Sequence, residues 1–334
     1  MATTLAAVIR GEVEESIHAG DLVAVNSEGR ILYSCGDSQR ITYMRSAAKP
    51  LQLIPLLRKG AHEDFGFNSR ELAVMAASHS GEAEHVSLVK SILEKIGLDS
   101  SYLQCGVHPP LHRGSRKALY QAGKKPNALH CNCSGKHSGM LALVRQMGWQ
   151  LENYLEHESP LQHLIRSTVL ELTSLCSEEM QLGIDGCGAP VFALTMERMA
   201  LAYARLATRQ EEAISTVVSS MMKHPMLVAG SDRFNTALMR ALPGSILAKS
   251  GAEGIFCFAL FSPPMGVAVK ISDGRARALP PVVLRFLREI GLLEEGENEH
   301  LQEYWEPDLR NNHQKKVGKI KALFTLFAGE EARD

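Results

Sequence analysis

The sequence lacks an excess of charge of either sign. Its 334 residues include 36 basic and 37 acidic side chains, which give a net charge of −1. Proteins that bind nucleic acids or anionic membranes through electrostatics carry a clustered basic excess. This chain has no basic stripe and no long run of like charge. The charge pattern therefore argues against nucleic acid or a membrane surface as a partner.

Long apolar runs are also missing. No stretch reaches the ~18 consecutive apolar residues that a membrane-spanning helix requires. The first residues, Met1 to Leu5, contain no basic segment followed by a sustained apolar stretch, so we expect no secretory signal. Without a span or a signal, the sequence predicts a cytoplasmic protein.

A disulfide framework is the third absence. Seven cysteines are an odd number, and they are spread over a long chain that is 45% hydrophobic and can bury an ample core. This usage argues for reduced thiols in the cytosol. We find no repeat of solenoid or propeller length. The chain is therefore expected to be a globular enzyme or binding protein, which we treat as a single domain, residues 1–334.

Strand-like segments lie at both ends of the chain and flank a mostly helical middle. Residues 5–35 resemble a short β-meander, with a turn at Asn26–Gly29 between β-branched runs. Further strands are expected at 245–251, 254–260 and 265–271, and helices at 46–60, 71–77, 83–96, 140–147, 159–175, 190–205, 210–222 and 281–290. We expect the tail after Gly291 to be less ordered.

The order of these segments predicts an α/β (α+β) fold. One antiparallel sheet is assembled from the N-terminal strands, about 1–45, and the C-terminal strands, about 245–290. Helices flank the sheet, and the mostly helical subregion spans about 46–244.

Ser46 and Lys49 form a Ser-x-x-Lys pattern at the start of an apolar helical segment. Residues three apart share a helix face, so the Ser46 hydroxyl and the Lys49 amine can meet. A serine needs a neighbouring base to become a nucleophile, and a desolvated lysine can serve as one. The pattern is weak alone, because the alternative is a helix-capping Ser46 and a solvated Lys49 on a surface helix.

Two later segments strengthen this interpretation. Ser78 and Ser80 lie in a hydroxyl-rich loop directly after an apolar helix, and Lys249 opens a Lys-Ser-Gly sequence on a predicted strand. Ser-x-x-Lys, a hydroxyl loop and a strand Lys-Ser-Gly follow one another in the same order in penicillin-recognising serine acylases. The alternatives are small polar residues that end a helix and an edge lysine that blocks aggregation.

Cysteines and other metal-binding side chains gather in two glycine-rich segments, 130–139 and 183–190. Cys133 and Lys136 lie in the first segment, and Asp185 and Cys187 lie in the second. Two thiolates and a carboxylate, with nearby histidines such as His137, can bind a soft divalent ion such as zinc. Buried free cysteines that pack as small hydrophobic residues are the alternative.

Four motifs resemble those of the Rhizobium-etli-type L-asparaginases, a class distinct from the threonine-nucleophile and plant-type enzymes. The resemblance extends from the first strands to about residue 275. The motifs are Ser46–Gln52, Ser78–Glu82, Cys131–His137 and Gly183–Gly188.

The resemblance implies a fold similar to that of serine β-lactamases and glutaminases, and an amidohydrolase that converts L-asparagine to L-aspartate and ammonia. It implies a homodimer and a zinc cofactor beside two Ser-Lys pairs. The implied residues are Ser46, Lys49, Ser78 and Lys249 for catalysis, Cys133, Lys136 and Cys187 for the metal, and Asp185, Arg45, His137 and Ser80 for the substrate.

Several alternatives stay open. Ser80 competes with Ser78 as the second serine, and Lys270 competes with Lys249 because family lengths vary before it. Ser46 is the preferred first nucleophile, with Ser78 as the alternative. A glutaminase or a β-lactam-recognising hydrolase can use the same serines and lysines with a roomier pocket. A non-enzymatic protein that binds zinc or an amino acid is the third possibility.

Overall fold

The computed structural model describes residues 3–329. The chain forms two compact units, each assembled from segments that are distant in the sequence. The first unit contains residues 1–47, 194–208 and 237–334, and the second contains 48–193 and 209–236. The boundary between them falls directly after Ala47, inside the Ser-x-x-Lys motif.

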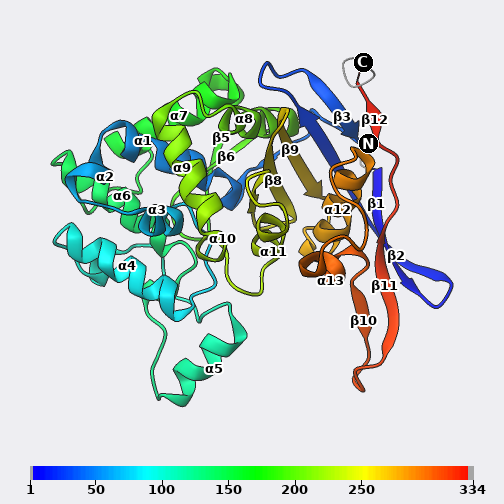
Figure 1. Ribbon diagram of the computed structural model, residues 1–334. Coiled ribbons are helices and arrows are strands. Elements are labelled where there is room, and N and C mark those ends of the chain that lie inside the picture. Colours follow the sequence, from blue (N-terminus) through cyan, green and yellow to red (C-terminus); the bar gives the residue numbers. More distant parts are fainter. Residues whose placement is uncertain (1–2, 330–334) are drawn as a thin grey trace. The chain divides into compact units, whose positions relative to one another are not determined.

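The first unit is built on one antiparallel sheet in which two N-terminal strands lie between two groups of C-terminal strands. The order is β10-β11-β1-β2-β9-β8-β7, and β3 pairs with β2 on one side and with β12 on the other. Figure 1 shows the C-terminal strand β11 (red) beside the N-terminal strand β1 (blue). The strand bounds are β1 Thr3–Arg10, β2 Val13–Val25, β3 Ile31–Cys35, β7 Ile246–Ser250, β8 Ile255–Phe261, β9 Pro264–Ile271, β10 Asp308–Arg310, β11 Lys316–Ala322 and β12 Phe327–Ala328.

Helix α8 (Met196–Thr208) packs against β9 at unusually close range. Gly266 makes this possible, because a Cβ at that position would overlap the carbonyl oxygen of Ala200 and the backbone nitrogen of Ala204. β9 is therefore buried along nearly its whole length. The other helices of this unit are α12 (Leu279–Glu289) and the short α13 (Gln302–Trp305), and β4 (Ile41–Tyr43) leads toward Ser46.

The second unit is mostly helical. Two of its helices, α3 and α6, approach closely because a Cβ on Gly135 would overlap the Val74 carbonyl oxygen. Strand β5 (Gln181–Ile184) pairs with the start of β6 (Pro190–Thr195). The helices of the second unit are α1 Lys49–Arg58, α2 Ala61–Asp64, α3 Ser69–Met75, α4 Ala83–Lys95, α5 Arg113–Gln121, α6 Ser134–Gln146, α7 Pro160–Thr173, α9 Glu212–Lys223 and α10 Pro225–Val228. Helix α11, Phe234–Ala241, leads out of this unit.

The predicted fold class is confirmed, and two elements were predicted wrongly. Residues 190–205 are not one helix, because β6 occupies 190–195 before α8 begins. The tail after Gly291 was expected to be less ordered, but its described part, up to residue 329, contains α13, β10, β11 and β12. Between residues 3 and 329, no helix combines the length and the apolar character that crossing a bilayer would require.

Candidate active site

Ser46 lies in the 3-10 turn Arg45–Ala48, which runs directly into α1. Its side chain is partly exposed, as a nucleophile must be. Arg45 has a φ of +50°, a left-handed value that side chains with a Cβ seldom adopt. The buried Tyr203 hydroxyl of α8 donates a 2.8 Å hydrogen bond to the Ala47 carbonyl oxygen. The first unit thus holds the turn through a strained residue on one side of Ser46 and a buried hydrogen bond on the other.

Lys249 lies on β7, in the same unit as Ser46. Its side chain is fully buried, and its Nζ donates a 2.9 Å hydrogen bond to the carbonyl oxygen of the next residue. The end of β7 contacts the turn that carries Ser46. A Cβ on Gly251 would lie 3.0 Å from the Met44 carbonyl oxygen and 3.2 Å from the Arg45 Cβ. The missing side chain of Gly251 therefore allows the Lys249 strand to lie beside the Ser46 turn.

Lys270, the alternative to Lys249, occupies β9 and is also buried. Its Nζ donates a hydrogen bond to the Glu253 carbonyl oxygen, in the turn between β7 and β8. Burial lowers the pKa of the Lys270 ammonium group below its ordinary value. The sheet thus carries two buried lysines. Lys249 lies on β7, and the end of β7 contacts the Ser46 turn.

Lys49 opens α1 in the second unit and is 1% exposed. Its Nζ donates hydrogen bonds to the carbonyl oxygens of Ala77 at 2.7 Å and Asn132 at 3.3 Å, and to Cys133 Sγ at 3.2 Å. The Lys49 side chain is therefore held by groups inside the second unit and not by solvent. The alternative of a solvated surface lysine is therefore wrong. The alternative of a capping Ser46 is wrong too, because no side chain caps α1.

The loop after α3 carries both candidate second serines, Ser78 and Ser80. Ser78 is partly exposed, and its Oγ lies 3.2 Å from Asn132 Nδ2. Ser80 is buried, and its Oγ has no hydrogen-bond partner among residues 3–329. The Gly230 backbone covers Ser80 so closely that a Cβ there would overlap its hydroxyl. These contacts favour Ser78 as the reactive hydroxyl and leave Ser80 with an unpaired one.

Cys133, Lys136 and Cys187 converge within the second unit. Cys133 precedes α6, Lys136 lies in its first turn, and Cys187 lies in the turn between β5 and β6. All three are buried. Lys136 Nζ donates a 3.1 Å hydrogen bond to Cys187 Sγ. The two cysteine-containing segments, which are far apart in the sequence, therefore form one cluster.

The electrostatics of this cluster favour an ionised sulfur. Hydrogen bonds from the thiols of Cys131 and Cys187 hold the pKa of Cys133 well below its ordinary value, although burial opposes them and the charges of Lys49 and Lys136 assist. Burial would lower the pKa of Lys136, but its electrostatic interactions with Cys187 and Cys133 outweigh burial and raise that pKa. Because thiolate is the metal-binding form of cysteine, Cys133 is prepared to act as a ligand.

His137 follows Lys136 on α6 and is fully buried. Its Nδ1 lies 2.7 Å from the hydroxyl oxygen of Tyr154, which also accepts a hydrogen bond from the Gln104 backbone. The Tyr154 hydroxyl and Nδ1 of His137 thus form a hydrogen bond inside the second unit. Burial holds the pKa of His137 well below its ordinary value. The neutral ring therefore keeps one buried nitrogen, Nε2, without a partner in the described part of the chain.

Asp185 lies in the turn between β5 and β6. Its backbone N–H donates to the Ala189 carbonyl oxygen at 2.9 Å, and its carboxylate accepts a hydrogen bond from the Gly186 N–H at 2.8 Å. The Asp185 charge helps to raise the pKa of Lys136. The Asp185 carboxylate thus favours the charged form of Lys136, the lysine of the cysteine cluster.

The donor set of the cysteine cluster suits zinc by chemistry. No group of three or more His, Cys, Asp or Glu side chains that could hold a metal occurs within residues 3–329. The implied set differs in kind, because it combines the sulfurs of Cys133 and Cys187 with the amine of Lys136. Two soft sulfur donors and one nitrogen are ligands that zinc accepts. Lys136 must lose its proton to take part.

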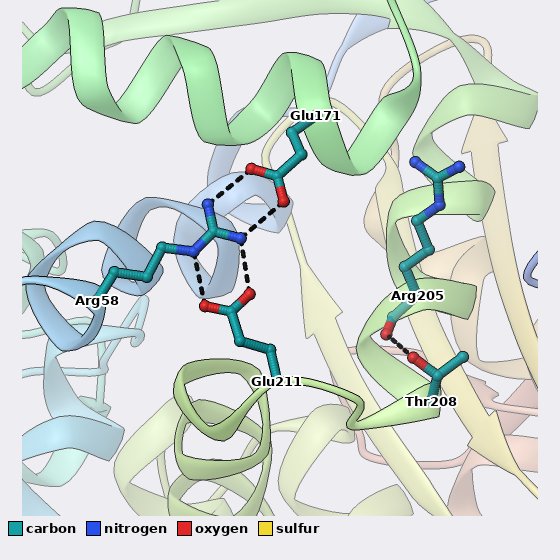
Figure 2. Close-up of polar contacts among 5 residues, drawn as sticks. All are labelled: Arg58, Glu171, Arg205, Thr208 and Glu211. Atoms are coloured by element: carbon teal, nitrogen blue, oxygen red, sulfur yellow. Dashed lines mark hydrogen bonds and ion pairs between the residues drawn. The ribbon is translucent and has the colours of Figure 1, made fainter.

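Helix α1 is also fixed at its other end. Arg58 donates two hydrogen bonds to the Glu171 carboxylate and two to the Glu211 carboxylate, each at 2.7 Å, as Figure 2 shows. The Glu211 and Glu171 hydrogen bonds raise the pKa of Arg58 above its ordinary value. This double clamp ties α1 to α7 and to the start of α9, so it fixes the helix on which Lys49 is the first residue.

Sequence reasoning missed three residues that hold the candidate site. Asn132 contacts Lys49 through its carbonyl oxygen and Ser78 through its side chain. His108 contacts Asn132, and Tyr203 anchors the Ser46 turn. Asn132 stands directly before Cys133 in the motif, but a sequence does not show which way an amide points. His108 and Tyr203 lie outside every motif, so no sequence signal identifies them.

A comparison with known families decides what this arrangement belongs to. The profile of the family described as L-asparaginase II matches residues 6–322, nearly the whole chain. The chain belongs to the L-asparaginase II family. The Rhizobium-etli-type resemblance is thereby confirmed, and membership makes the protein an amidohydrolase. No curated protein matches the chain.

The solved structures that resemble this L-asparaginase-family chain include a glutaminase and a β-lactamase. A Bacillus glutaminase is 14% identical with a TM-score of 0.38, over 82% of this chain and 91% of its own. A β-lactamase from Mycobacterium bovis is 13% identical with a TM-score of 0.33, over 81% and 94%. EstCE1, a hydrolase with promiscuous acyltransferase activity, is 10% identical with a TM-score of 0.37, over 76% and 88%. Because these TM-scores are low, our description of the fold depends on the strand order alone.

Proposed function

We propose that this protein hydrolyses L-asparagine to L-aspartate and ammonia. The observation that carries the proposal is the family match, which spans residues 6–322 and so includes both Ser-Lys motifs and both cysteine segments. The burial of Lys49 and Lys249 supports it, because neither lysine is the solvated surface residue that a merely structural role would require.

The proposed reaction is acyl transfer. Ser46 Oγ attacks the side-chain carbonyl carbon of asparagine, and its proton passes to Lys49. Ser78 and Lys249 deliver a proton to the amide nitrogen, the carbon–nitrogen bond breaks, and ammonia leaves. Water then cleaves the ester between Ser46 and the aspartyl group, which releases aspartate and restores the serine hydroxyl.

Four polar residues are proposed to bind the ends of the substrate. Asp185 suits the α-amino group and Arg45 suits the α-carboxylate, because hydrogen bonds to a charged side chain are the strong ones. His137 and Ser80 complete the set. The assignment of these two residues is supported by their unpaired atoms. His137 Nε2 and Ser80 Oγ are both buried and have no hydrogen-bond partner among the described residues. A hydrogen bond from a ligand to such an atom stabilises the complex, because the buried atom is otherwise unpaired.

Zinc is proposed as a cofactor held by Cys133, Lys136 and Cys187. Bound there, it would act as a Lewis acid that holds the α-amino and α-carboxylate ends of the substrate. Two serines are already available as nucleophiles, so we assign no water activation to the metal. Support comes from the low pKa of the Cys133 thiol and from the contact between Lys136 and Cys187.

A homodimer in the cytoplasm is the proposed state of the enzyme. The dimer comes from the family resemblance. The cytoplasmic setting is supported by the cysteines, because all seven are free thiols and six of them are buried.

Ammonia release from L-asparagine and L-glutamine, measured side by side, tests the function. Turnover of asparagine with little turnover of glutamine is the expected result. Faster turnover of glutamine would make the protein a glutaminase, and labelling by a penicilloyl probe would make it a β-lactam-recognising hydrolase. Zinc or amino-acid binding without any turnover would favour the non-enzymatic alternative.

A further inference from the structure

Asn132 connects two residues of the proposed machinery inside the second unit. Its carbonyl oxygen accepts hydrogen bonds from Lys49 Nζ at 3.3 Å and from the His79 backbone N–H at 3.1 Å. Its side-chain Nδ2 lies 3.2 Å from Ser78 Oγ. One residue thus contacts both the proposed base and the proposed second serine.

His108 supports Asn132 from the other side. The Asn132 backbone N–H donates a 3.0 Å hydrogen bond to His108 Nε2, so that nitrogen is an acceptor. The other ring nitrogen, Nδ1, lies 2.8 Å from the Pro109 carbonyl oxygen and must carry a hydrogen to make that contact. The two contacts together define the neutral Nδ1–H tautomer of His108.

This tautomer decides which end of the Asn132 amide faces which neighbour. Asn132 Oδ1 lies 3.3 Å from His108 Nε2, which would place two acceptors against each other. The nitrogen and oxygen of an amide have nearly the same shape, so the surrounding hydrogen bonds determine their positions. A half-turn of the amide presents NH2 to His108 Nε2 and Oδ1 to Ser78. Cys131 Sγ, 3.9 Å from the same amide atom, is too distant to oppose the turn.

We propose that Asn132 is a positioning residue whose Oδ1 accepts the hydrogen of the Ser78 hydroxyl, and that His108, as the Nδ1–H tautomer, fixes this orientation. The proposal rests on the role of Ser78 in the proposed function. A hydroxyl held in this way has one rotamer, and both lone pairs of its oxygen remain open to accept a proton. In a relay the serine first accepts a proton on one of these lone pairs and then releases one toward the leaving nitrogen, and the Asn132 contact orients the hydroxyl for the first of these events.

Ring nitrogen chemical shifts test the orientation without reference to activity. In full-length protein labelled with 15N-histidine, we expect His108 to show a protonated Nδ1 and an unprotonated Nε2, with the signals assigned by their loss in His108→Gln. A protonated Nε2 would overturn the proposal. This NMR measurement does not require turnover. A failure of the proposed function would appear differently, as a wild type that releases no ammonia from asparagine.

Kinetics of matched variants test the positioning role. Asn132→Ala and His108→Leu should lower kcat for asparagine about tenfold or more and leave KM within about twofold, because they disturb a proton step and not binding. His108→Gln should restore most of kcat, since its Oε1 can accept the same backbone hydrogen bond. Asn153→Ala is the control for loss of an asparagine outside the site. Wild-type kcat in a folded Asn132→Ala protein would overturn the proposal.

Discussion

The Lys49 side-chain nitrogen lies 3.2 Å from the Cys133 sulfur. The proposed base of the first Ser-Lys pair therefore contacts a proposed metal ligand. Both belong to the second unit, and the neighbouring residues Asn132 and Cys133 supply two of the three acceptors of Lys49, a carbonyl oxygen and a side-chain sulfur. A change at the cysteine cluster is thus expected to affect the lysine directly, so catalysis and metal binding should be tested together.

Lys49→Met should abolish turnover and also reduce stability. The substitution keeps most of the buried volume but removes the base, so we expect kcat to fall by several powers of ten. It also leaves the Ala77 and Asn132 carbonyl oxygens without their donor, at a cost of about 1–3 kcal/mol in the free energy of unfolding. Ammonia release and chemical denaturation measure the two effects. Lys59→Met, at an exposed lysine directly after the other end of the same helix, should change neither.

Gly251→Ala should reduce activity more than it reduces stability. The added Cβ would lie 2.7 Å from Ile255 Cγ2 and 3.0 Å from the Met44 carbonyl oxygen, so the end of β7 and the Ser46 turn must separate. The cost of such overpacking is about 1–3 kcal/mol, whereas a shift of a nucleophile by an ångström costs about 100-fold in rate. Thermal unfolding and kcat are the measurements. Unchanged kcat would show that β7 does not fix the Ser46 turn.

Arg58→Met should destabilise the protein in a pH-dependent way. The clamp on Glu171 and Glu211 is partly exposed, so we expect a loss of about 1 kcal/mol at neutral pH. Its hydrogen bond lowers the pKa of Glu211, so this contribution is present above the ordinary glutamate value of 4.5 and is lost as the pH falls below it. Urea denaturation of wild type and variant should therefore differ at pH 7 and converge under acid conditions. Arg145→Met, an exposed arginine, is the control.

Zinc removal should weaken substrate binding more than it slows chemistry. Purified protein is expected to contain zinc, and chelation should raise KM for asparagine while kcat changes little, because the metal is assigned to holding the substrate. Cys187→Ser should lose the metal, whereas Cys176→Ser, an exposed cysteine, should keep it. Metal analysis and steady-state kinetics provide the measurements. An active wild type that contains no zinc would contradict an essential metal.

Periodicity predicted most of the sheet because most of its strands alternate or are wholly apolar. It failed at residues 190–205, where the alanine- and methionine-rich α8 masks the short strand β6 before it. It failed again after Gly291, because β10 and β11 are largely polar and only Ile320 and Ala322 of β11 are buried. β11 is held in the sheet by pairing with β1, a contact distant in sequence that no local pattern shows, and β10 pairs with β11.

Motifs identified the reactive side chains but not what holds them. Ser46, Lys49 and Cys133 could be selected because their spacing matches a known chemistry. The contacts of Asn132 with Ser78 and of Tyr203 with the Ser46 turn connect residues 54 and more than 150 positions apart. Such partners depend on the folded backbone, so only the structure reveals them.

Ammonia release from L-asparagine by wild type and Ser46→Ala tests the central claim most directly. Circular dichroism should show the same fold for both proteins. The account predicts steady turnover by the wild type and a loss of several powers of ten in the variant, because no other group is assigned to the first attack. Wild-type turnover in Ser46→Ala would contradict it and would move the nucleophile to Ser78.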